Sequence, residues 1–206
     1  MLYSQYPDSD YHLAVWQMDE TLDQLKELVS PALWDEAGQR FAAPHRRREW
    51  LTVRLLLSHM LGEEKRIAYL PSGKPYLADT PLHIGISHTK GFAAVILASR
   101  PVAVDIEQYG PKVCRVASRF MHSAEKAYPW KGDETWSLLL HWSAKETLFK
   151  AMDVEEVDFK EHLRIRPFLP QEEGCISACE YKTEQKRHFA VRYLLRPDFV
   201  LTYIVD

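Results

Sequence analysis

The sequence has no long apolar run and no excess of positive charge. No apolar stretch approaches the roughly 20 residues that a membrane-spanning helix needs, and residues 1–8 show no basic region followed by an apolar one. The net charge is −3 and the pI is near 6.3, which gives no general attraction to nucleic acid or to an anionic membrane. We therefore expect a cytoplasmic protein that binds no nucleic acid and no membrane, in which any anion site is formed locally.

The sequence also has few cysteines, no repeat of fixed period and no P-loop motif. Its three cysteines, Cys114, Cys175 and Cys179, include no C-x-x-C pair, which argues against a disulfide framework and against a zinc site. By contrast, 46% of the 206 residues are hydrophobic, which is enough to bury a core in one domain or in two small ones.

The spacing of apolar residues predicts helices followed by strands in each half of the chain. In the first half we expect helices that begin at a cap on Asp19 or Thr21, at Pro31 and near Pro44, the last one ending at Gly62. Strands are expected at residues 12–16, 82–87, 92–98 and 102–107. In the second half, helices are expected at 113–120, 123–128 and 134–152, and strands at 163–165, 176–181, 188–193 and 200–205. This layout predicts an α+β fold of two similar units, residues 1–100 and 101–206.

Two carboxylates stand two residues apart at the end of a predicted strand. Side chains at positions i and i+2 of a strand point to the same face, so Asp105 and Glu107 converge while Val104 and Ile106 face the core. Hard oxygen ligands in this arrangement suit Mg²⁺. An ordinary exposed strand face is the alternative.

A third carboxylate lies on the predicted helix at 134–152. Leu138, Trp142, Glu146 and Lys150 form one row at four-residue spacing, which begins apolar and ends ionic. Glu146 is therefore expected where the core-facing stripe meets a polar site. The alternative is a surface ion pair between Glu146 and Lys150.

Several side chains in the first half are suited to binding phosphate. Ser87 and His88 end a predicted strand, and Lys74 lies in a turn that Pro75 makes rigid. Arg47 and Arg48 belong to a cationic run in the first turn of a helix, where an anion would relieve the unfavourable interaction with the helix dipole. A structural histidine and a solvated basic surface are the alternatives.

These residues occur in an order that resembles a known family. The chain resembles the 4′-phosphopantetheinyl transferases, specifically the larger monomeric type that activates peptide synthetases, such as surfactin synthetase. The matching residues are Gly73-Lys74-Pro75, Ile86-Ser87-His88, Val104-Asp105-Ile106-Glu107, and Trp142-Ser143-Ala144-Lys145-Glu146 with Lys150. Arg119-Phe120 followed by Glu125 is similar to the connecting segment of the family. The resemblance runs from about Arg40 to Lys150, and the last fifty residues carry no motif.

The resemblance implies a fold, a reaction and a set of site residues. The family fold is a pseudo-twofold pair of α+β halves with coenzyme A in the cleft between them, and the reaction moves its phosphopantetheine arm to a serine of an acyl or peptidyl carrier protein. Adenosine 3′,5′-bisphosphate is released. A monomeric enzyme is expected.

The resemblance also assigns roles to individual residues. By resemblance, Asp105, Glu107 and Glu146 would bind Mg²⁺, and Glu146 would be the general base. Lys150 would hold Glu146 or the pyrophosphate. Contacts to coenzyme A are implied for Lys74, Ser87, His88, Arg47, Arg48 and Lys150, and His88 is also a catalytic candidate.

Two departures from the family pattern bear on these roles. Ala103 stands where the family often has glycine before the metal-site aspartate, and residues 34–38 hold no lysine or arginine, whereas relatives have basic residues there that contact the nucleotide. Two other functions fit the same residues: an Mg²⁺-dependent phosphohydrolase, and a non-catalytic module that binds carrier proteins or nucleic acid through its arginine cluster.

Overall fold

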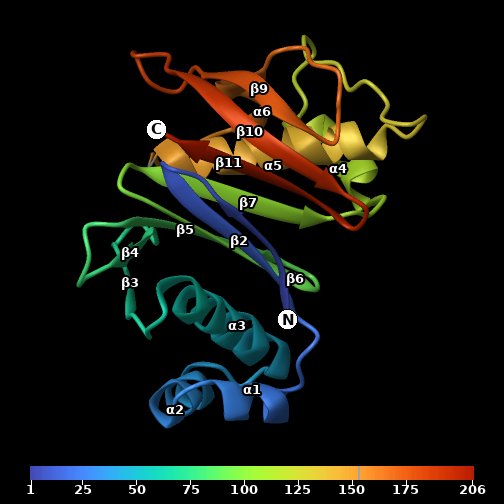
Figure 1. The fold of residues 1–206 in the computed structure, drawn as a ribbon. Coiled ribbons are helices and arrows are strands. Elements are labelled where there is room, and N and C mark those ends of the chain that lie inside the picture. The colour runs from blue at the N-terminus through green and yellow to red at the C-terminus, as the bar shows by residue number, and fades with distance from the viewer. Residues whose placement is uncertain (153) are drawn as a thin grey trace. The chain divides into compact units, whose positions relative to one another are not determined.

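The computed structural model describes residues 1–152 and 154–206, which form two compact units, Met1–Pro101 and Val102–Asp206. Each unit contains helices and an antiparallel sheet (Figure 1), so the predicted α+β fold with two sheet-containing halves is confirmed. Within the described ranges, no helix is both long and apolar enough to cross a membrane.

The sheet of the first unit has four strands in the order β1-β2-β6-β5. The strands are β1 (Leu2–Pro7), β2 (Tyr11–Gln17), β5 (His83–Thr89) and β6 (Phe92–Ala98), and every neighbouring pair is antiparallel. Strands β3 (Ile67–Tyr69) and β4 (Pro75–Leu77) form a separate hairpin. Gly73 in its turn has φ +85°, a conformation that other residues adopt at a cost.

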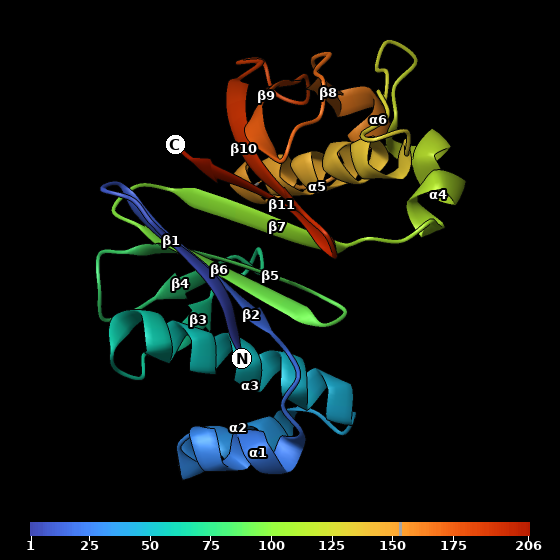
Figure 2. The ribbon, with the colours of Figure 1, turned by 45° about the vertical axis from the view of Figure 1, so that its right-hand side comes forward.

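Three helices cover one face of this sheet in two layers. Helix α3 (Pro44–Leu61) packs Val53, Leu56 and Leu57 against the sheet, while its other side packs Trp50 and Leu51 against α1 (Leu22–Leu28) and α2 (Pro31–Arg40). Figure 2 shows the layers in this order, with α3 between the sheet and the two shorter helices. The helix ends follow the predicted signals: Thr21 caps α1, Pro31 begins α2, Pro44 begins α3, and Gly62 ends α3 at φ 73°.

The sheet of the second unit has five strands in the order β7-β11-β10-β9-β8. Their bounds are Val102–Gln108 for β7, Leu163–Ile165 for β8, Glu173–Glu180 for β9, His188–Arg196 for β10 and Phe199–Val205 for β11. All neighbours are antiparallel. The helices are α4 (Lys112–Phe120), α5 (Thr135–Met152) and the short α6 (Phe159–His162).

Helix α5 is the central element of the second unit. Leu140, Ala144 and Leu148 are fully buried in a core that also contains Ile176 and Val200 of the sheet. Because α5 is buried on almost every side, polar residues on it must find partners within the protein. This requirement positions the site described below.

The structure contains no helix at the predicted position 123–128, and helix α6 and strands β1, β3 and β4 were not predicted. Residues 123–128 form a loop, in which the carboxylate of Glu125 accepts backbone hydrogen bonds from His122 and Ile165, both at 2.7 Å. Such bonds compete with helix formation, and Pro129 disfavours a helical residue before it. Strands β3 and β4 have three residues each, too short for a periodic pattern.

Candidate active site

Strand β7 presents Asp105 and Glu107 toward helix α5. Val104 and Ile106 are buried, as alternation predicts, but Asp105 is also only 4% exposed. An ordinary exposed strand face is therefore excluded for Asp105. A buried carboxylate is costly unless it is paired or hydrogen-bonded, and each partner of Asp105 described below supplies such an interaction.

Both oxygens of Asp105 accept hydrogen bonds from side chains of α5. Lys150 Nζ lies 2.8 Å from Oδ1, and the hydroxyl of Ser143 donates to Oδ2 at 2.8 Å. Lys150 also donates to the carbonyl of Val104 at 3.1 Å. The predicted partner of Lys150 was Glu146 or a pyrophosphate. In the structure Lys150 forms an ion pair with Asp105, and its positive charge also lowers the pKa of Glu146. The surface ion pair considered for this helix is thus replaced by a contact between helix and strand.

Glu107 is held by an indole. Trp142 Nε1 donates to Glu107 Oε1 at 2.7 Å, and the Trp142 ring packs against Phe120 and Phe159, with ring centroids 5.3 and 5.5 Å apart. Two aromatic contacts restrict the indole, so the direction of its N–H is well defined. The indole therefore restrains the orientation of the Glu107 carboxylate.

Glu146 has a raised proton affinity. Its pKa is raised from 4.5 to about 7, first by burial and then by the negative charges of Asp105 and Glu107, while the positive charge of Lys150 opposes the rise. The three acidic residues therefore share one neighbourhood, here called the carboxylate cluster (Asp105, Glu107 and Glu146).

The donor chemistry of the carboxylate cluster fits a divalent cation with a preference for oxygen ligands. A raised carboxyl pKa next to two further carboxylates is the condition that a cation would relieve. Among the described residues, no group of three or more histidine, cysteine, aspartate or glutamate side chains is gathered into a ready metal site. The metal-binding role of these three residues stays a prediction.

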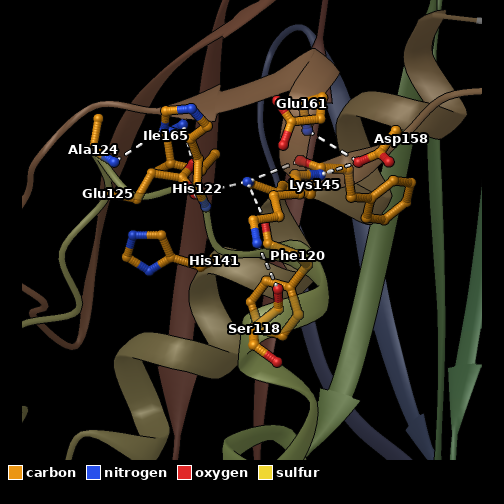
Figure 3. Close-up of polar contacts among 12 residues, drawn as sticks. Ser118, Phe120, His122, Ala124, Glu125, His141, Lys145, Asp158, Glu161 and Ile165 are labelled. Carbon is orange, nitrogen blue, oxygen red and sulfur yellow. Dashed lines mark hydrogen bonds and ion pairs between the residues drawn. The ribbon is translucent and has the colours of Figure 1, made fainter.

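A buried ion pair between Lys145 and Glu125 anchors α5 (Figure 3). Lys145 and Glu125 are both fully buried, with 2.8 Å between Nζ and Oε2. Lys145 also donates to the carbonyls of Phe120 at 2.6 Å and Phe159 at 3.0 Å, while Glu125 accepts from the backbone N–H of Ile165. Burial lowers the pKa of Lys145 and the charge of Glu125 raises it. The pair links α5 to the ends of α4, α6 and β8.

Three predicted phosphate-binding residues lie in the first unit, near the ends of strands. Ser87 and His88 are on β5, with Ser87 buried and His88 Nδ1 3.9 Å from Glu49 Oε2. Lys74 lies in the turn between β3 and β4, and its carbonyl accepts from the backbone N–H of Leu70 at 2.9 Å. Their roles toward coenzyme A stay predictions.

The predicted arginines differ in what they already contact. Arg47 donates to the carbonyls of Phe41 at 2.6 Å and Gly38 at 3.3 Å, so its side chain stabilises the end of α2. Arg48 has a buried Nε atom without a hydrogen-bond partner among the described residues. Since an unpaired buried donor is costly, Arg48 is the stronger of the two candidates for an anion.

Comparison with known proteins identifies the family. A family model described as the 4′-phosphopantetheinyl transferase superfamily matches residues 101–204. The chain belongs to this superfamily. The 4′-phosphopantetheinyl transferase AcpT of Escherichia coli O157:H7 is 40% identical over 79 residues, which are 36% of this chain and 40% of the relative. The 4′-phosphopantetheinyl transferase of Bacillus subtilis is 32% identical over 85 residues, 38% of this chain and 37% of the relative.

These findings confirm the superfamily, while the larger monomeric subtype stays a prediction. The chain spans about two fifths of the length of the curated relatives that it matches. The family match extends to residue 204, so the last fifty residues belong largely to the superfamily domain although they carry no recognisable motif.

Sequence reasoning named Trp142, Ser143 and Lys145 as motif residues but assigned them no function, and it missed Thr202 entirely. Thr202 lies on β11 directly opposite Asp105 in the strand register, and its hydroxyl is 2.9 Å from that of Ser143. A threonine in an apolar strand is common, so no sequence signal distinguishes it.

Proposed function

We propose that the protein transfers the 4′-phosphopantetheine arm of coenzyme A to a serine of an acyl or peptidyl carrier protein, with Mg²⁺ as cofactor and adenosine 3′,5′-bisphosphate as second product. The observation that carries this proposal is the carboxylate cluster of a superfamily member, in which the pKa of Glu146 is raised to about 7. A bound Mg²⁺ would offset the negative charges that raise this pKa, and a carboxylate can serve as general base toward a serine hydroxyl.

Each acidic residue has a defined part in this proposal. Asp105, Glu107 and Glu146 would hold Mg²⁺, which when bound neutralises charge on the pyrophosphate and stabilises the leaving group. The carrier serine oxygen forms a bond to the β-phosphorus, and the bond from that phosphorus to the bisphosphate leaving group breaks. The serine proton goes to the carboxylate of Glu146. Lys150 holds Asp105 in place and presents positive charge beside Glu146.

Residues of the first unit would bind the rest of coenzyme A. Lys74, Ser87 and His88 are proposed for its phosphates, and Arg47 and Arg48 for the 3′-phosphate. Arg47 can contribute only the guanidinium N–H groups that it does not use at the end of α2. The pseudo-twofold arrangement, with the cofactor between the halves, is part of the proposal and rests on the family resemblance, as do the monomeric state and a cytoplasmic location.

Mass spectrometry of a carrier protein tests the proposal. The protein is incubated with coenzyme A, Mg²⁺ and a panel of apo carriers, and the mass of one phosphopantetheine group is expected on at least one carrier. Glu146→Gln, which is nearly isosteric but cannot accept the proton, is expected to lower the rate at least 100-fold. No added mass on any carrier would refute the transferase.

Two further outcomes would redirect the assignment. Release of inorganic phosphate or nucleotide without any carrier would indicate a phosphohydrolase. Binding of carriers that is unchanged in Glu146→Gln, without transfer by either protein, would indicate a non-catalytic module.

A further inference from the structure

Three buried hydroxyl groups connect helix α5 to strand β11 behind Asp105. Ser143 Oγ lies 2.9 Å from Thr202 Oγ1, and Thr147 Oγ1 lies 2.6 Å from the same Thr202 atom. All three residues are completely buried. The chain of contacts ends at Asp105, because Ser143 donates to its Oδ2 at 2.8 Å.

Counting protons sets the direction of this chain. A hydroxyl has one proton, and an ionised carboxylate can only accept. The Ser143 hydroxyl donates its only proton to Asp105, so in the contact between Ser143 and Thr202 the Thr202 hydroxyl must be the donor. Thr202 in turn must accept from Thr147, whose single proton is shared between Thr202 Oγ1 at 2.6 Å and the Thr202 carbonyl oxygen at 3.2 Å. All three O–H dipoles therefore point toward the negative charge of Asp105, and each strengthens the next.

The alternative is that these are ordinary helix hydroxyls. Serine and threonine inside a helix often bond the carbonyl one turn earlier in the same helix. Here Ser143 and Thr147 instead bond across to the sheet, and Thr147 also lies 3.2 Å from the carbonyl oxygen of Thr202. The contacts therefore tie α5 to the sheet at the level of Asp105.

The helix geometry connects this chain to Glu146. Ser143, Glu146, Thr147 and Lys150 occupy one face of α5, at offsets of three, four and seven residues. Ser143 and Lys150 hold the two oxygens of Asp105 from either end of this face. The plane of the Asp105 carboxylate is fixed relative to Glu146, which lies between them in the sequence.

We propose that Ser143, Thr202 and Thr147 form a positioning network that orients Asp105 for binding a divalent cation together with Glu146. The inference rests on the proposed function, since it concerns the same site. Partners of metal ligands fix ligand orientation, and their loss typically lowers metal affinity or activity about 10- to 100-fold. Thr202 thereby gives the last fifty residues a part in the site.

Binding of Mn²⁺ tests this network. It is measured in the presence of coenzyme A and without a carrier, from the electron paramagnetic resonance signal of the free ion. Thr202→Val keeps the side-chain shape and removes the hydroxyl; we expect about 10-fold weaker Mn²⁺ binding. Thr202→Ser retains the hydroxyl and is expected to bind within about twofold of the wild type. In transfer assays, Thr202→Val is expected to lower kcat about 10-fold and to change KM for the carrier less than twofold.

A matched control separates positioning from general effects of the substitution. Thr52 on α3 is also fully buried, and its hydroxyl has no partner among the described residues. Thr52→Val is therefore expected to match the wild type in Mn²⁺ affinity and kcat. If Thr202→Val does not fold, as judged by circular dichroism, Ser143→Ala takes its place and is expected to weaken Mn²⁺ binding at least as much.

The outcomes distinguish this inference from the proposed function. Wild-type protein that neither binds Mn²⁺ nor transfers phosphopantetheine refutes the proposed function. The positioning network is overturned if the wild type is active and a folded Thr202→Val protein has the same Mn²⁺ affinity and kcat. The same result for Ser143→Ala, where it replaces Thr202→Val, also overturns it. A variant that loses melting temperature but keeps both values also overturns it, because the hydroxyls would then serve stability alone.

Discussion

The raised pKa of Glu146 predicts that removing its charge stabilises the protein in a pH-dependent manner. In the folded chain the pKa is about 7, compared with 4.5 for an ordinary glutamate. The folded state therefore holds this proton more tightly than the unfolded state. The contribution of this proton to the free energy of unfolding is present in full below pH 4.5. It falls as the pH rises from 4.5 to 7 and stays at its lower level above pH 7.

The magnitude follows from the two pKa values. At 1.36 kcal/mol per pH unit, the difference corresponds to about 3 kcal/mol. Glu146 is only partly buried, and contact with solvent screens its charge, so roughly 2 kcal/mol is a realistic size. Glu146→Gln is expected to equal the wild type near pH 4 and to exceed its free energy of unfolding by roughly 2 kcal/mol at pH 8.

Urea unfolding without metal, followed by circular dichroism, measures this difference at pH values from 4 to 8. Glu184→Gln, an exposed position in the same unit, controls for the exchange of a carboxylate for an amide. A difference between Glu146→Gln and the wild type that stays constant with pH would refute the reasoning. Adding Mg²⁺ with coenzyme A is expected to shrink the difference, because bound cation relieves the excess negative charge.

Three further substitutions have expected outcomes. Trp142→Phe keeps the ring packing but removes the N–H donated to Glu107, so kcat in the carrier assay is expected to fall about 10-fold while the melting temperature changes little. Lys145→Met leaves the fully buried Glu125 without its counter-charge, and urea unfolding is expected to show a loss of about 3–5 kcal/mol; Glu125→Gln in the same chain is expected to recover part of it. Arg47→Met removes two hydrogen bonds at the end of α2 and is expected to cost about 1–3 kcal/mol in the same measurement, whereas an unchanged stability would leave Arg47 to ligand binding alone.

Much of the local structure was predictable because its causes lie within a few residues. Thr21 caps α1 through a contact three residues away, and Gly62 ends α3 because it adopts a left-handed conformation at no steric cost. Alternation along β7 likewise indicated that Asp105 and Glu107 share a face. The order of the motifs was sufficient to indicate the superfamily, which the family match confirms.

The sequence by itself determined most of the elements, the family and the acidic residues, because periodicity, capping and motif order are local properties of the chain. Tertiary structure alone decided that Lys150 pairs with Asp105, that Trp142 holds Glu107, and that Thr202 stands behind Ser143. These partners lie 35 to 59 residues apart in the chain, and only the packing of α5 on the sheet brings them together. The pKa of Glu146 has the same origin, because burial and neighbouring charge exist only in the folded protein.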